Sequence, residues 1–436
     1  MTETTTAATP VPSSPPQAAP TSFVRALEID MRFLGMVGAL AAIWIVFDIL
    51  ADGTFLTPRN LWNLSVQSSS IAVMSTGMVL IIVMRHIDLS VGSILGVTGM
   101  IMAVFQASYL MPTFGFNHPA VMILTLAAGI GVGAAIGALH GFVIAYLGVP
   151  AFIVTLGGLL VWRGAAWAVA EGKTIPLTDD NFKLLGGGAN GSIGETWSWV
   201  VAVIACLAIA FATVQARRQR QRFHFPLKPI WAEVTTIVAG CIAVIGATLV
   251  VNAYTLPAAL ARRYAEAAGI DVPPEGLSIS FGYAVPVLVA LAVGIVMTFV
   301  TNRTRFGRYV FAIGGNPEAA ELAGINTKRV TLAVFALMGA LAAIGAAIST
   351  ARLNSATNAQ GTLDELYVIA AAVIGGTSLS GGSGTIAGAM LGALVMQSLQ
   401  SGMVLMRVDT PYQNIVVGIV LVFAVWIDTV YRKRFK

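Results

Sequence analysis

Charged residues are scarce in this chain: Asp, Glu, Lys and Arg make up 10% of its 436 residues, against about 25% in soluble globular domains. A soluble protein is therefore excluded as the main architecture. Cysteine and histidine are also rare. The two cysteines, Cys206 and Cys241, fall in different apolar runs and are interpreted as small buried residues. Because the four histidines are scattered, we expect no metal site and no cofactor.

Enzyme motifs are missing as well. Gly172-Lys-Thr174 resembles part of a phosphate-binding loop, but Trp167 stands where that loop requires a glycine. Leu379-Ser-Gly-Gly382 is similar to the signature of ATP-binding cassettes, yet it lies between apolar segments and no nucleotide site completes it. The sequence has no HExxH motif and no nucleophile elbow. We therefore expect a protein that is not an enzyme and cannot hydrolyse ATP alone.

Hydrophobic residues make up 57% of the chain and recur in runs near the 20 residues that a membrane-spanning helix needs. The pattern predicts an all-α, polytopic transmembrane bundle. Leu366–Leu379 is short, which leaves a half-buried or re-entrant segment open. We expect about twelve spans, at Phe33–Leu50, Val66–Met84, Ser90–Leu110, Pro119–Leu147, Ala151–Ala170, Trp197–Val214, Ile230–Val251, Phe281–Thr301, Val330–Thr350, Leu366–Leu379, Thr385–Met406 and Tyr412–Val430.

The basic residues predict the orientation of these spans. With both termini cytoplasmic, 17 of the 25 Lys and Arg residues fall on the inside, 7 fall outside and Arg163 lies within a span, as the positive-inside rule requires. The net charge of +5 then reflects topology, not nucleic-acid binding. Residues 1–22, rich in Thr, Pro and Ala, are expected to be a disordered cytoplasmic tail. Residues 23–430 are the membrane domain, and 431–436 a basic cytoplasmic end.

Glycines recur at every fourth residue in two spans, and this spacing favours close packing between helices. One ridge comprises Gly129, Gly133, Gly137 and Gly141, and the other comprises Gly384, Gly388 and Gly392.

Residues 302–329 separate two apolar runs and contain a very short helix whose ends are both encoded. Asn316 is suited to the N-cap, Pro317 to the first helical position and Gly324 to the left-handed position after the last turn. Glu318 adds negative charge to the first turn. A helix of about seven residues is not stable alone in water. It is therefore either a plug for the groove of another protein or an ordinary surface helix.

Several motifs together resemble the permeases of bacterial monosaccharide ABC importers, the ribose, arabinose, galactose and xylose type. The resemblance covers roughly residues 55–430, although Arg85-His86 stands where the family usually has two glycines. The motifs that carry it are Arg85-His-Ile-Asp-Leu-Ser-Val-Gly-Ser93, Gly137-Ala-Leu-His-Gly-Phe142, Val149-Pro-Ala-Phe-Ile-Val-Thr-Leu156, Thr304-Arg-Phe-Gly-Arg-Tyr309, Gly314-Gly-Asn-Pro-Glu-Ala-Ala320 and Gly375-Gly-Thr-Ser-Leu-Ser-Gly-Gly382.

The resemblance implies a homodimeric permease in the bacterial inner membrane that carries a monosaccharide. It also implies two partners, a cytoplasmic ABC ATPase subunit and a periplasmic sugar-binding protein. The ATPase would dock on the segment Gly314–Ile325, with Glu318 and the small residues of the helix in its groove. The expected coupling residues are Gly314, Gly315, Asn316, Pro317, Glu318, Ala319, Ala320, Ala323 and Gly324.

An extra pair of spans narrows the resemblance. Permeases of this family usually have ten spans, and here Trp197–Val214 and Ile230–Val251 form an inserted pair, at about 197–251, joined through Arg217–Arg222. This insertion resembles the xylose-type permeases, so D-xylose is the favoured sugar, with ribose, arabinose or galactose as alternatives. An ion-coupled secondary sugar transporter is the second hypothesis, although most charges lie at span ends. A membrane scaffold without transport activity is the third.

A neutral sugar needs hydroxyl and amide partners, so polar residues within spans are candidates for the pathway. The alternative is that they only bond neighbouring helices. The candidates are Gln67, Ser68, Ser69, Ser70, Thr155, Gln397, Ser398, Gln400 and Ser401. Arg59 and Arg352, on short outer segments, are expected to help dock the binding protein, and Arg262 and Arg263 lie on a longer outer segment.

Overall fold

The computed structural model describes residues 31–268 and 278–434, without the side chains of residues 31–32, 263–265, 267–268 and 427–434. The expected tail at 1–22 and the side chains of the basic end at 431–436 lie outside this part, as does the side chain of Arg263.

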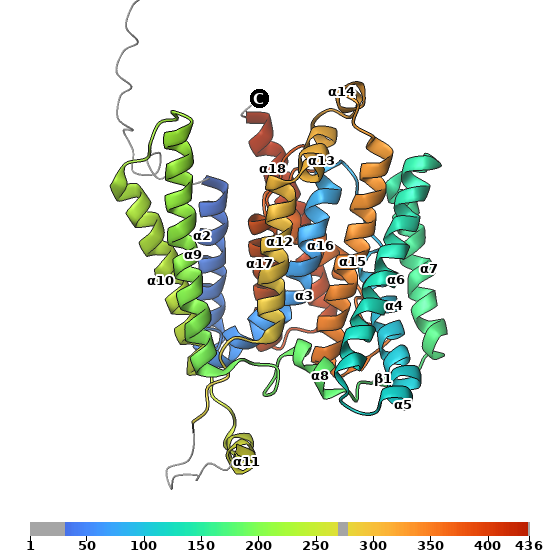
Figure 1. The fold of residues 1–436 in the computed structure, drawn as a ribbon, viewed down its shortest axis with the longest axis vertical. Coiled ribbons are helices and arrows are strands. Elements are labelled where there is room, and N and C mark those ends of the chain that lie inside the picture. The colour runs from blue at the N-terminus through green and yellow to red at the C-terminus, as the bar shows by residue number, and fades with distance from the viewer. Residues whose placement is uncertain (1–30, 269–277, 435–436) are drawn as a thin grey trace, which may run out of the picture.

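The described chain is a bundle of helices with a single pair of two-residue strands (Figure 1). Ten helices in it are long and apolar enough to cross a membrane, which confirms the expected polytopic bundle. The ten helices are α2 (Met31–Leu50), α3 (Pro58–Val83), α4 (Val91–Phe105), α6 (Pro119–Tyr146), α7 (Ala151–Ala170), α9 (Gly194–Arg222), α10 (Ile230–Ala253), α12 (Val285–Arg303), α15 (Thr327–Leu353) and α17 (Ile386–Leu405). Helix α18 (Thr410–Arg434) is not counted among them, because its described apolar part, Thr410–Trp426, is shorter. The short elements are η1 (Gln106–Leu110), α5 (Met111–Phe114), β1 (Ile175–Pro176), α8 (Asp180–Lys183), η2 (Leu184–Gly186), α11 (Ala258–Ala268), α13 (Arg305–Gly315), α14 (Pro317–Leu322), β2 (Ser355–Ala356) and α16 (Asp364–Ile374).

The bundle has two distinct ends. At one end β1 pairs with β2, Ile175 opposite Ala356, and α5 and α8 lie close by (Figure 1). We call this the strand end. The opposite end carries α13, α14 and the C-terminal end of α18 (Figure 1). We call it the α14 end.

Helix α3 forms the centre of the bundle, because it is buried along almost its whole length and packs against α12, α15, α16 and α17. Both glycine ridges lie in helix contacts, as expected. A Cβ atom at Gly137 of α6 would meet the Phe335 carbonyl of α15, and one at Gly392 of α17 would meet the Ala371 carbonyl of α16. The ridges therefore let backbones of the same chain approach one another.

The expected short span at Leu366–Leu379 is an interrupted crossing. Helix α16 has only 11 residues, which is roughly 16 Å of helix, or half of a membrane core of about 30 Å. Irregular segments extend it in both directions. At the strand end Ser355 pairs with Pro176, and at the α14 end the Gly382 N–H donates to the Val83 carbonyl at 3.0 Å. We call residues 355–385 the broken crossing.

Arg163 of α7 donates hydrogen bonds to the irregular part of the broken crossing. Its guanidinium donates to the carbonyls of Asn358 at 3.1 Å, Gln360 at 2.6 Å and Gly361 at 3.0 Å. Irregular backbone at membrane depth needs such partners. A structural role therefore accounts for the one cation expected within a span.

The inserted pair, α9 and α10, packs as a hairpin at the edge of the bundle, where α10 contacts α3 (Figure 1). Helix α9 is longer than expected: it runs through the basic stretch to Arg222, so the connection between the two helices is residues 223–229. Basic side chains suit the last turns of a helix, where the carbonyl dipoles point. Arg217 also pairs with Glu233 of α10, with Nη1 and Oε2 2.9 Å apart.

A second helix, α13, precedes the predicted short helix and was not expected from the sequence. The Thr304 hydroxyl caps it by accepting from the Gly307 N–H at 3.2 Å. Phe306, Val310 and Ile313 recur at helical spacing and pack on the core. Basic residues lie between them in the sequence and obscure this period.

Candidate functional site

Helix α14 begins and ends where the sequence predicts. The Asn316 carboxamide oxygen accepts from the Ala319 N–H at 3.0 Å, and Pro317 occupies the first position. After the last turn, Gly324 has φ +83°, and the Ile325 N–H donates to the Ala320 carbonyl at 3.1 Å. Both ends of the helix are thus capped within the segment, so its shape does not depend on a partner.

The two sides of α14 differ in exposure. Ala320 is only 4% exposed and packs on the core, so its side chain faces this chain instead of pointing outward with Ala319 and Ala323. Leu322 is 90% exposed and was not among the residues expected from the sequence. Glu318 is also exposed. The outward side of α14 therefore presents an apolar side chain next to small residues and a carboxylate.

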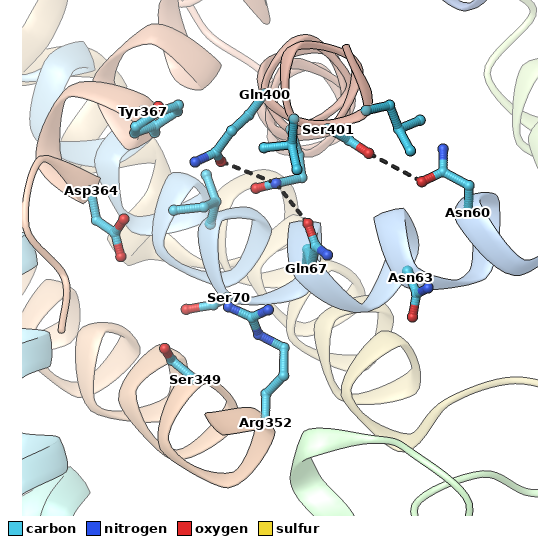
Figure 2. A pocket seen from close by; sticks show the side chains of 14 residues that line it. Asn60, Asn63, Gln67, Ser70, Ser349, Arg352, Asp364, Tyr367, Gln400 and Ser401 are labelled. Atoms are coloured by element: carbon cyan, nitrogen blue, oxygen red, sulfur yellow. Dashed lines mark hydrogen bonds between the residues drawn. The ribbon is translucent and has the colours of Figure 1, made fainter. Parts of the chain in front are cut away.

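A polar cavity of about 410 Å³ lies at the strand end between α3, α15, α16 and α17 (Figure 2). Four helices contribute to it because each carries polar residues on one face. On α3 these residues follow helical spacing, at Asn60, Asn63, Gln67 and Ser70. The remaining lining residues are Ile71, Ser349, Arg352, Asp364, Tyr367, Gln397, Gln400, Ser401, Val404 and Leu405.

Amide side chains form one wall of this cavity. The Gln397 amide donates from Nε2 to Gln67 Oε1 and to Gln400 Oε1, each at 3.1 Å, and the Ser401 hydroxyl donates to Asn60 Oδ1 at 3.3 Å (Figure 2). These bonds join α3 to α17. They also leave amide groups at the cavity surface that can exchange a mutual hydrogen bond for one to a hydroxyl.

Two opposite charges face the cavity from its other wall. Arg352, in the last turn of α15, extends toward the centre, and Asp364 approaches from the first turn of α16 (Figure 2). Among the residues that the structure describes, neither Arg352 nor Asp364 forms an ion pair shorter than 4.0 Å. The guanidinium and the carboxylate therefore face the same cavity without forming an ion pair. Both can form charge-assisted hydrogen bonds with a ligand.

The structure brings together five of the candidate pathway residues, Gln67, Ser70, Gln397, Gln400 and Ser401. Ser68, Ser69, Thr155 and Ser398 do not line this cavity. Ser69 donates to the Ser65 carbonyl at 2.8 Å and Thr155 to the Ala151 carbonyl at 2.9 Å. Ser398 accepts from the Trp44 indole at 2.9 Å. Their polar groups are used between or within helices, the alternative that the sequence left open.

Other residues that line the cavity were not predicted from the sequence. The spacing of Asn60 and Asn63 with Gln67 and Ser70 could have revealed the first two, because the four residues share one face of α3. Asp364 and Tyr367 could not have been found, since only the broken crossing brings them beside α3.

The arginines expected at the docking surface lie in different settings. Arg59 is exposed in the first turn of α3, and Arg262 is exposed on α11. Arg352 is exposed as well, but it lines the polar cavity and a neighbouring cavity of about 380 Å³. Asn63 and Gln67 also line both cavities. Arg352 is therefore part of the cavity wall and not of a loop.

Residues 60–425 match the family model described as "branched-chain amino acid transport system / permease component". The chain is 34% identical to the xylose transport system permease protein XylH of Escherichia coli strain K12, over 97% of this chain and 98% of the relative. It is 34% identical to XylH of Haemophilus influenzae, over 93% and 98%. It is 30% identical to the ribose import permease protein RbsC of E. coli strain K12, over 93% and 95%. No solved structure matches the chain.

Proposed function

The chain belongs to the family of branched-chain amino acid transport system permease components, and from this premise we propose that it is the membrane-spanning permease of an ATP-binding cassette importer for a monosaccharide, with D-xylose as the favoured sugar. The family description names amino acids, but the relatives that match nearly the whole chain are named for xylose and ribose. These relatives match more of the chain than the family model does, and their names specify a sugar, so the proposed substrate is a sugar.

The polar cavity at the strand end is the observation that carries this proposal. Amides, hydroxyls, a guanidinium and a carboxylate converge on it, and these are the groups that exchange hydrogen bonds with a polyol. Most of the residues that line the cavity are polar. Ile71, Val404 and Leu405 are its aliphatic members.

The remaining parts of the proposal concern orientation and partners. We place the α14 end in the cytoplasm and the strand end outside, because basic residues are concentrated toward the former in the sequence. The cytoplasmic ATPase then docks on α14 and hydrolyses the ATP. A periplasmic sugar-binding protein delivers sugar to the cavity, and two permeases form a homodimer in the inner membrane.

Deleting the gene is expected to abolish high-affinity uptake of radiolabelled D-xylose, and a plasmid copy should restore it. The expectation follows because a sole permease is the only route for sugar released by the binding protein. Loss of ribose, arabinose or galactose uptake alone would correct the sugar and keep the transport function. Unchanged uptake of all four sugars would contradict the proposal.

Arg59 is expected to steer the binding protein. Arg59→Glu should raise the half-maximal concentration of binding protein in sugar-stimulated ATPase assays about threefold at low salt, and less at high salt, because exposed charges are screened. Arg407→Glu is the control, since Arg407 is exposed between α17 and α18 at the same end. Equal titration curves for the Arg59 variant and the parent at both salt concentrations would show that Arg59 is an ordinary surface charge.

A further inference from the structure

Arg85 occupies a backbone position that favours glycine. The Arg85 N–H donates to the Ile82 carbonyl at 2.8 Å and the His86 N–H to the Ile81 carbonyl at 3.0 Å, so α3 ends in a Schellman motif. Arg85 holds the left-handed position of this motif, with φ +64°. Glycine adopts this conformation without steric cost, whereas a residue with a Cβ does not. An arginine at this strained position suggests that its side chain makes a contact that offsets the strain.

The side chain of Arg85 reaches the base of α14. Its Nε donates to the Gly314 carbonyl at 2.9 Å, and its Nη2 donates to the Gly315 carbonyl at 2.7 Å. These are the last two residues of α13, and their carbonyls have no partner within that helix. A guanidinium forms strong hydrogen bonds to such carbonyls because the donor is charged.

The broken crossing also contacts the ends of α3 and α13. The Gly382 N–H donates to the Val83 carbonyl at 3.0 Å. A Cβ on Gly381 would meet both Arg85 and the Gly314 carbonyl, and one on Gly314 would meet the Val83 carbonyl. Three segments, the end of α3, the end of α13 and the end of the broken crossing, therefore pack too closely for a side chain at Gly314 or Gly381. We call this contact the glycine junction.

The broken crossing connects the glycine junction to the polar cavity. One continuous segment carries Asp364 and Tyr367 at the cavity, in the first turn of α16, then the rest of α16, then Gly381 and Gly382 at the junction. A displacement of α14 would act on the Gly314 and Gly315 carbonyls, to which Arg85 donates. The stiff, glycine-packed junction can pass that displacement to α16.

We propose that Arg85 is a positioning residue that fastens the base of α14 to the glycine junction, so that movement of α14 is passed along the broken crossing to Asp364 and Tyr367. This inference rests on the proposed function for its consequence, the coupling of ATP hydrolysis to sugar. The attachment itself belongs to this chain alone and can be measured without transport.

Arg85→Gly is the informative variant, because glycine keeps the left-handed backbone and removes the two side-chain hydrogen bonds together with the packing of the side chain on Gly381. In the purified permease, amide hydrogen exchange of residues 314–325 should become about tenfold faster, while exchange in α3 stays unchanged. Arg85→Lys keeps the charge but loses the planar fork, and an intermediate rate is expected. Arg218→Ala is the control, since it removes an exposed arginine of α9 at the same end.

The second readout is the ratio of ATP hydrolysis with and without sugar-loaded binding protein in the reconstituted complex. We expect this ratio to fall about fivefold in Arg85→Gly, with thermal stability and complex assembly retained. Unchanged exchange in residues 314–325 overturns the attachment. Faster exchange with an unchanged ratio overturns its role in coupling. If the parent complex shows no response to sugar, the proposed function fails, while the exchange result still decides the attachment.

Discussion

Replacing Leu322 with aspartate is expected to abolish sugar-stimulated ATP hydrolysis and uptake while the permease inserts and folds normally. Leu322 is 90% exposed on α14, so the substitution disturbs no contact within this chain. If Leu322 fills a groove of the ATPase, its burial contributes about 2 kcal/mol, and a carboxylate in the same groove adds an uncompensated desolvation cost. Together these effects reduce docking by at least about a hundredfold.

The measurement is co-purification of the ATPase with the permease, together with ATP hydrolysis of the reconstituted complex. Leu227→Asp is the matched control, because Leu227 is an exposed leucine in the connection after α9 at the same end. Ala320 is a poorer test, because its buried side chain holds α14 on the core, and a bulky substitution would displace the helix itself. Normal docking of the Leu322→Asp permease would refute α14 as the ATPase contact.

Asp364→Asn and Arg352→Gln are each expected to raise the sugar concentration for half-maximal uptake about tenfold or more at saturating binding protein. Asp364→Asn removes the charge and keeps the size of the side chain, whereas Arg352→Gln removes the charge and shortens the side chain. The loss corresponds to a charge-assisted hydrogen bond to a sugar hydroxyl, about 1.5–3 kcal/mol. Asp409→Asn and Arg407→Gln are the controls, since both residues are exposed near the end of α17 and outside the cavity.

The double variant separates binding from charge balance. If Arg352 and Asp364 each contact the sugar, the double variant transports worse than either single variant. If the two charges serve only to neutralise each other across the cavity, removing both restores transport toward that of the parent. Restoration, or single variants with unchanged uptake, would therefore contradict a direct role for this pair in sugar binding.

Local features of the chain could be predicted with confidence from the sequence because short-range rules determine them. The length of the apolar runs predicted the membrane helices, and Asn316 with Gly324 predicted both ends of α14. Glycines at every fourth residue predicted close helix packing. In each case the relevant contacts involve residues a few positions apart or one repeated face of a helix.

The sites depended on contacts that no local pattern contains. Asp364 and Gln67 line one cavity because the broken crossing packs beside α3. The length of the apolar run alone could not show which part of that crossing is helical. Ser69 and Ser398 lie near cavity residues in sequence, but helix rotation directs them to other partners.

Amino-acid composition and spacing thus determined that this chain is a helical membrane protein, and its motifs pointed to a permease with a short docking helix. Tertiary structure alone decided which side of α14 is exposed, which polar residues share a cavity, and that Arg85 holds the Gly314 and Gly315 carbonyls. The reason is physical: hydrophobicity and capping act within a helix, whereas the position of a side chain in a site depends on how helices distant in sequence pack.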